Sequence, residues 1–171
     1  MADSDRRQQL RQQYLKLGVG ELVAAALFCV LAITTVQPRL EPGEAPALWG
    51  GLAPLVVVLL QGGAYWLLAR SWVKVSPMPR SLAVTFSALR VANVALLLAG
   101  LAAVALWWPA RAHIGVLAVI AWLFGVVEYV NYYVARLAYP VTQWLARVGE
   151  WRTPRLVQDL RSAQRGGAGG A

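Results

Sequence analysis

Seven polar side chains interrupt long apolar stretches of this sequence, and their chemistry has to be explained first. They are Arg90, Glu128, Asn93, Asn131, Gln61, Glu21 and Tyr132. A charge near the centre of a bilayer costs at least about 2.5–3.5 kcal/mol, so charges at such depth usually pair with one another or line a functional path. An arginine and a carboxylate can neutralise each other there, and the same groups can bind a substrate, relay a proton or hold a lipid headgroup.

The spacing of these residues places several of them at one level. Arg90, Gln61 and Glu128 each lie eight to ten residues from a basic residue that flanks the apolar run. At about 1.5 Å per residue, that spacing is roughly 12–15 Å along a helix. Asn93 and Asn131 follow Arg90 and Glu128 by three residues, so each pair shares a helix face. We therefore predict an ion pair between Arg90 and Glu128, with Glu21 as a second carboxylate and the remaining polar side chains as hydrogen-bond partners.

Three interpretations of this buried polar cluster stay open. The ion pair can serve only to fix how the helices pack. The cluster can instead line a site or path for a substrate, a proton or a lipid headgroup. In the third interpretation, Arg90 and Glu128 extend separately to the membrane surface and never meet.

The composition indicates a membrane protein. Hydrophobic residues make up 58% of the 171, and only 14% are charged, against about 25% in a soluble domain. Four apolar runs are long enough to cross a bilayer: residues 18–36, 47–69, 81–108 and 113–137. We predict an all-α fold, a four-helix transmembrane bundle. Small residues should let its helices approach closely, namely Gly18, Ala25, Gly62, Gly100 and Gly125.

The segments outside the spans are polar or basic. Residues 1–17 predict an amphipathic lead that lies on the membrane or runs straight into the first span. Residues 37–46 hold three prolines and a glycine, which predicts an exposed, non-helical loop. Residues 140–164 predict short interfacial or cytoplasmic basic helices, the second opening at Thr153-Pro154. The glycine-rich residues 165–171 predict a disordered tail.

The distribution of positive charge predicts the orientation. The net charge is +8, and the two ends of the chain together with the second loop hold thirteen of the 16 lysines and arginines. The first and third loops hold one each, Arg39 and Arg111. Basic residues concentrate on the cytoplasmic side of membrane proteins, so we expect a multi-pass protein of the cell membrane with both termini in the cytoplasm.

Few other chemistries fit the sequence. We find no phosphate loop, metal-ligand spacing or hydrolase motif, and we expect no cofactor, no metal and no nucleic acid. Cys29 has no second thiol, and His113, the single histidine, has no catalytic partner in the pattern. An enzyme is therefore the least favoured class.

Three short runs carry a family resemblance: EYVNYY at residues 128–133, WRTPRL at 151–156 and QGGAYW at 61–66. The chain resembles uncharacterised small integral membrane proteins of high-GC actinobacteria. That resemblance implies a four-helix membrane fold, and since the family has no assigned activity it implies no functional residues.

Two function classes remain. The first is a structural or accessory protein that binds partner proteins or anionic lipid headgroups through its basic flanks, with the polar cluster as a packing device. The second is a small transporter or channel, a homo-oligomer whose path is lined by Glu128, Arg90 and nearby amides.

Overall fold

The computed structural model describes residues 2–135 and 153–168, and this part of the chain contains helices and no strand. Helix α1 spans Ala2–Leu31 and continues through a π-helical turn, Ala32–Val36, and a 3₁₀ turn, Gln37–Arg39. The other helices are α2, Ala45–Trp72; α3, Arg80–Leu106; α4, Ala112–Tyr133; and α6, Arg155–Ala168.

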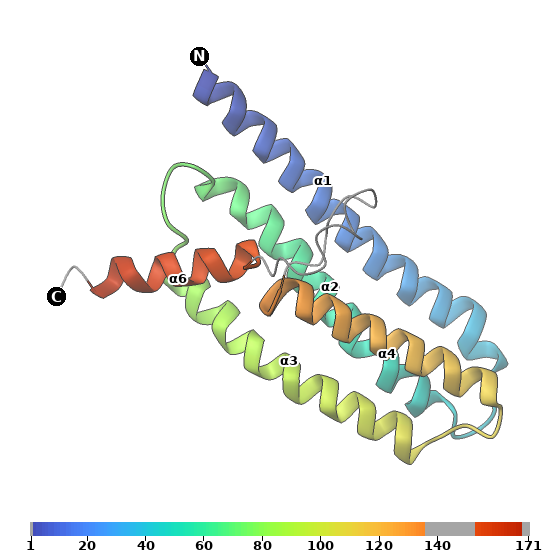
Figure 1. Ribbon diagram of the computed structural model, residues 1–171. Helices are drawn as coiled ribbons and strands as arrows, with labels where there is room; N and C mark the ends of the chain where they lie inside the picture. The colour runs from blue at the N-terminus through green and yellow to red at the C-terminus, as the bar shows by residue number, and fades with distance from the viewer. Residues whose placement is uncertain (1, 136–152, 169–171) are drawn as a thin grey trace, which may run out of the picture.

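Four of these helices, α1 to α4, are long and apolar enough to cross a membrane, as predicted. They run alongside one another as a bundle (Figure 1). The fourth helix ends at Tyr133, before the predicted end at residue 137, because Val134 leaves helical geometry with φ −120° and ψ −63°. Residues 136 and 137 lie outside the described part of the chain.

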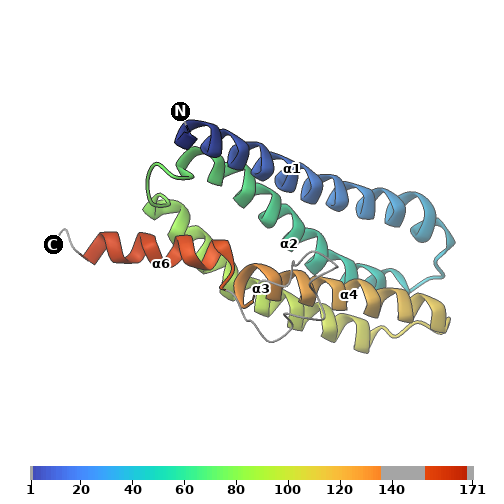
Figure 2. The ribbon, with the colours of Figure 1, turned by 45° about the horizontal axis from the view of Figure 1, so that its top comes forward.

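Helix α2 is the centre of the bundle and contacts α1, α3 and α4 (Figures 1 and 2). Half of the most apolar stretch of α2 is buried. The corresponding share is 11% in α1 and 22% in each of α3 and α4. Large apolar side chains on those outer helices point away from the bundle, including Val23, Leu27, Val91 and Leu98. In water such a surface would be unfavourable, whereas lipid chains would cover it without cost.

Small residues allow the helices to approach closely, as predicted for the four glycines and Ala25. A Cβ atom added to Gly62 would lie 2.5 Å from Cζ of Tyr132, and one added to Gly100 would overlap the carbonyl oxygen of Gly50. A Cβ added to Gly125 would lie 3.1 Å from the backbone nitrogen of Leu55. Gly18 packs in the same way against α2, and Ala25 is almost fully buried.

The N-terminal lead is part of α1 rather than a separate surface helix. One unbroken helix runs from Ala2 to Leu31, so of the two predicted arrangements the structure forms the continuous one. Tyr14, in the lead, is buried and belongs to the same core cluster as Tyr65 and Trp72 of α2. The lead therefore extends the bundle beyond the predicted span.

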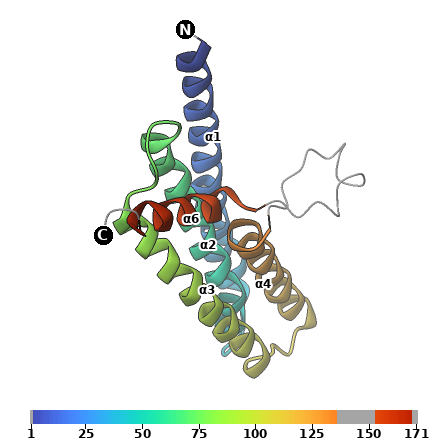
Figure 3. The ribbon, with the colours of Figure 1, turned by 60° about the vertical axis from the view of Figure 1, so that its left-hand side comes forward.

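Helix α6 lies across the end of the bundle where α1 starts (Figure 3). It buries Leu156 and Leu160 in the core cluster that contains Tyr65, so it is docked on the bundle. It begins beside Thr153-Pro154, as predicted, but continues to Ala168, which corrects the predicted disorder of residues 165–168. The other interfacial helix, predicted within residues 140–152, and residues 169–171 lie outside the described part.

The predicted loop 37–46 is more ordered than expected. A 3₁₀ turn forms over Gln37–Arg39, because proline is tolerated at the first helical position. Gly43 adopts φ +94°, a conformation that favours glycine. Glu44 is buried with 4% of its surface exposed, although this loop was predicted to be exposed.

Candidate functional site

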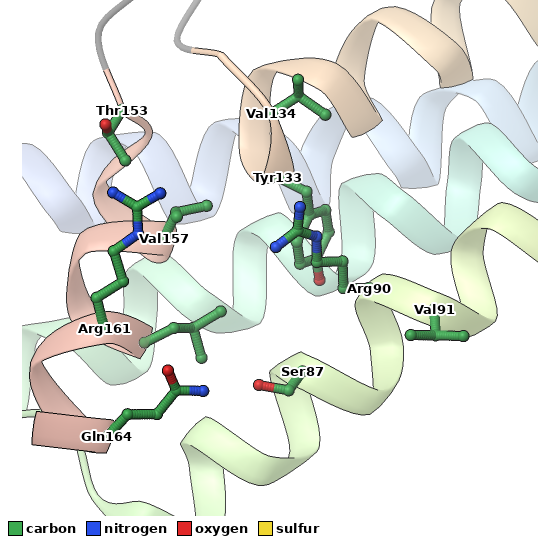
Figure 4. A pocket seen from close by; sticks show the side chains of 10 residues that line it. Ser87, Arg90, Val91, Tyr133, Val134, Thr153, Val157, Arg161 and Gln164 are labelled. Atoms are coloured by element: carbon green, nitrogen blue, oxygen red, sulfur yellow. The ribbon is translucent and has the colours of Figure 1, made fainter.

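The predicted ion pair is not formed. Arg90 and Glu128 both lie in the described part of the chain, and no salt bridge joins their side chains. On α4, the Tyr129 hydroxyl donates to the Arg90 backbone carbonyl oxygen at 3.3 Å, and Tyr133 lies beside the Arg90 side chain (Figure 4). Successive residues on a helix are about 100° apart, so Glu128 faces elsewhere. Glu128 lies one turn before Tyr132, whose hydroxyl contacts Glu21 of α1, so Glu128 is on the α4 face that is turned toward α1.

The amides of the predicted cluster satisfy each other. Gln61 Nε2 donates to Asn93 Oδ1 at 3.0 Å, and Asn93 Nδ2 donates to Gln61 Oε1 at 2.7 Å. The Tyr133 hydroxyl also donates to Gln61 Oε1, at 3.2 Å. Asn93 is only 1% exposed, so this contact joins α2, α3 and α4 inside the bundle, with Gln61 bonded one turn beyond Arg90 on the α3 face.

A second polar group joins α1, α2 and α4. The Tyr132 hydroxyl donates to Glu21 Oε1 at 2.6 Å and accepts from Trp66 Nε1 at 3.0 Å. Glu128 is close enough to Glu21 for their charges to interact, and it bonds to the side chain of Asn131. The predicted cluster therefore divides into the amide pair, a carboxylate group beside α1, and Arg90, which belongs to neither.

Asp159 on α6 is a buried carboxylate that our sequence reasoning missed. Its Oδ2 accepts from the Tyr65 hydroxyl at 3.0 Å and from Trp72 Nε1 at 3.1 Å. Its Oδ1 lies 3.2 Å from Nε of Arg155. The sequence did contain a signal, because Leu156, Asp159 and Leu160 have the i, i+3, i+4 spacing of one helix face.

Two basic cavities open at the end of the bundle that carries α6 and the start of α1. The first, about 420 Å³, lies between α1 and α2 and is lined by Arg7, Gln8, Arg11, Gln12 and Arg70. No described carboxylate lines it. Nε of Arg7 and Nε of Arg70 are buried and have no hydrogen-bond partner. Unsatisfied buried donors are costly, so this cavity has the properties of an anion site.

The second cavity, about 550 Å³, lies between α3, the end of α4 and α6 (Figure 4). Arg90 lines one wall and Arg161 lines another, and no described carboxylate is among the lining residues. Tyr133 and Val134 form the side contributed by the end of α4. Arg90 therefore faces α6 rather than the carboxylates beside α1.

The opposite end of the bundle holds a closed ion pair. Arg111 donates through Nε to Glu44 Oε1 at 3.1 Å, and its Nη2 donates to Glu44 Oε2 and to the carbonyl oxygen of Arg39. The Arg111 hydrogen bonds, together with the Glu41 backbone N–H, lower the pKa of the Glu44 carboxyl to about 2. The same contact raises the pKa of Arg111. Arg111 at this end is thus engaged, whereas five arginines at the α6 end line the two cavities: Arg7, Arg11, Arg70, Arg90 and Arg161.

Comparison with protein-family models, with curated protein sequences and with solved structures found no match. The resemblance to actinobacterial membrane proteins stays a prediction.

Proposed function

We propose that this chain is an accessory protein of the cell membrane, with both termini in the cytoplasm, that holds anionic phospholipid at its arginine-rich end. Four candidate membrane spans and the exposed apolar faces of the outer helices support residence in a bilayer. The concentration of arginine and lysine at one end supports the orientation, since basic residues favour the cytoplasmic side. The anionic lipid of that leaflet is then the nearest partner.

The cavity of Arg7, Arg11 and Arg70 is the observation that carries this proposal. Three guanidinium groups from two helices line one space without a described carboxylate among them. Each guanidinium is a fork of donors that matches a phosphate. A phosphate in this cavity would accept hydrogen bonds from guanidinium groups whose buried Nε atoms, in Arg7 and Arg70, have no other partner in the described part of the chain.

Lipid binding can be measured by native mass spectrometry of the protein in mild detergent with added phosphatidylglycerol or phosphatidylcholine. We expect tighter binding of phosphatidylglycerol. Arg70→Gln should weaken it roughly fivefold, since one basic residue near a charged surface contributes about 1 kcal/mol. Arg39→Gln, the same change at the opposite end, is the matched control and should have little effect. Equal affinity for the two lipids would contradict the proposal.

A small transporter or channel is the second candidate, favoured by a separate observation. A cavity of about 130 Å³ is lined by Glu21, Asn131 and Tyr132, with Pro154 and Arg155 at the beginning of α6 contributing to its wall. Carboxylates within candidate spans are a common feature of proton and cation paths. Glu21→Gln and Glu128→Gln should then abolish proton or cation flux into proteoliposomes. If the unmodified protein shows no proton or cation flux, the transporter or channel function is excluded.

A further inference from the structure

Two helix faces oppose each other across the 550 Å³ cavity, and each carries one arginine. The α3 face contributes Ser87, Arg90 and Val91, at i, i+3 and i+4. The α6 face contributes residues at i, i+3, i+4 and i+7: Val157, Leu160, Arg161 and Gln164. Residues with these spacings lie on one side of a helix, so both arginines are directed to the same space.

The electrostatics of this space favour an anion. Arg90 and Arg161 lie on walls formed by different helices in Figure 4. The carboxylate of α6, Asp159, is engaged by Tyr65 and Trp72 on the other side of that helix. Two arginines line this cavity, and no described carboxylate lies on its wall, so a phosphate between them could accept charge-assisted hydrogen bonds from both.

The cavity is also open to the apolar surface of the bundle. Val91 is 72% exposed and Val134 is 50% exposed, and both line the cavity beside the arginines. Along α3, the exposed Val94 and Leu98 continue this apolar surface for two further turns. A ligand that fits has a phosphate at one end and hydrocarbon at the other, whereas a free phosphate would leave the apolar wall uncovered.

We propose that the cavity between α3 and α6 binds one anionic phospholipid, with its phosphate diester between Arg90 and Arg161 and its acyl chains along Val91, Val94 and Leu98. Ser87 and Gln164 line the same cavity and are in position to bond the hydroxyl groups of a glycerol headgroup. The proposal rests on the membrane residence proposed above, but it concerns a different cavity from that of Arg70. It also gives Arg90 a role that requires no contact with Glu128.

The docking of α6 completes this site. Four of the lining residues belong to α6, which is held against α2 by the contacts of Asp159 with Tyr65 and Trp72. Binding of a lipid would therefore stabilise the docked position of α6, because a ligand stabilises the conformation that contains its site.

The test compares single variants by native mass spectrometry in mild detergent, with phosphatidylglycerol as the probe. Arg90→Gln and Arg161→Gln should each weaken binding of one tightly held phosphatidylglycerol by about tenfold, the effect of losing a charge-assisted hydrogen bond. Arg80→Gln, on the same helix as Arg90 but outside the cavity, is the control and should change binding less than threefold or so. Arg161→Lys should restore only part of the affinity, since lysine keeps the charge without the bidentate geometry.

Two results would overturn this inference. In the first, Arg90→Gln and Arg161→Gln bind phosphatidylglycerol like the unmodified protein; if Arg70→Gln still weakens binding, the proposed function survives and only this site is lost. In the second, inorganic phosphate displaces phosphatidylglycerol as effectively as a short-chain phosphatidylglycerol does, which would assign the cavity to a free anion. Hydrogen exchange of α6 in each variant confirms that the helix is still docked.

Discussion

The hydroxyl of Tyr65 on α2 donates a hydrogen bond to Oδ2 of Asp159 on α6, at 3.0 Å and across 94 residues of chain. Trp72, two turns further along α2, donates to the same oxygen. Because α2 is the most buried of the four candidate spans, this carboxylate attaches helix α6 to the centre of the bundle. The wall that carries Arg161 is positioned by that attachment.

Replacing Asp159 by alanine should release α6. The change leaves the buried donors of Tyr65 and Trp72 without a partner, and each unsatisfied buried donor costs about 1–3 kcal/mol. Hydrogen exchange followed by mass spectrometry should show faster exchange of the α6 amides, with α3 little affected. Gln158→Ala is the control: it removes only an exposed hydrogen bond to the Thr153 carbonyl oxygen and should leave α6 protected. Unchanged protection of α6 in Asp159→Ala would contradict this role.

Gly62→Ala should destabilise the bundle, because the added Cβ would lie 2.5 Å from the ring of Tyr132. That ring is buried and held by Glu21 and Trp66, so it cannot move away freely. Overpacking of this kind costs about 1–3 kcal/mol. The matched control is Gly20→Ala on α1, where no atom lies within 4 Å and the higher helix propensity of alanine should stabilise slightly. Reversible unfolding in mixed micelles measures both; equal effects would refute the packing argument.

The amide pair of Gln61 and Asn93 should show energetic coupling. Gln61→Leu leaves the buried Asn93 amide unsatisfied, and Asn93→Leu leaves the half-buried Gln61 amide with only its bond from Tyr133, whereas the double variant leaves neither amide. Polar contacts between membrane helices average about 0.6 kcal/mol, with a maximum near 1.7, so two reciprocal bonds should give a coupling of about 1–2 kcal/mol. Strictly additive effects of the two single changes would mean that the pair does not form.

Acid should weaken the end of the bundle held by Glu44 and Arg111. The pKa of Glu44 is lowered from its ordinary value near 4.5 to about 2, so the folded state binds this proton less readily than the unfolded state. The stabilisation is therefore complete above about pH 4.5 and is lost as the pH falls toward 2. The stability difference between the unmodified protein and Glu44→Gln should shrink over that range. Glu41→Gln, at the more exposed and longer 3.6 Å contact, should show a smaller change with pH. A pH-independent difference for Glu44→Gln would contradict the ion pair.

Hydrophobicity and the positions of proline and glycine were sufficient to predict the four long helices. Each span is long, apolar and bounded by breakers, and such patterns depend on local sequence alone. The small residues at helix contacts followed from the same reasoning. The end of α4 was wrong by several residues, because Val134 leaves helical geometry although the apolar pattern continues past it.

The partners of the polar residues could not be predicted in the same way. Depth along a helix can be estimated from spacing: Gln61 was predicted at the level of Arg90, and it bonds to Asn93, one turn further along the same face. Rotation about the helix axis cannot be estimated from spacing, and a difference of one residue turned Tyr129 rather than Glu128 toward Arg90. Asp159 was missed because this segment was expected to form a short basic helix, interfacial or cytoplasmic, while the contacts of Asp159 with Tyr65 and Trp72 depend on tertiary packing.

The most direct test of the account is the side of the membrane on which the arginine-rich end lies. In a Cys29→Ser background, which removes the single native cysteine, Gln9→Cys and Glu41→Cys place one exposed thiol at each end of the bundle. Membrane-impermeant maleimide applied to intact cells should label Glu41→Cys, and Gln9→Cys should react only after the cells are opened. Labelling of Gln9→Cys in intact cells, with Glu41→Cys protected, would place the basic cavities outside the cytoplasm and contradict the account.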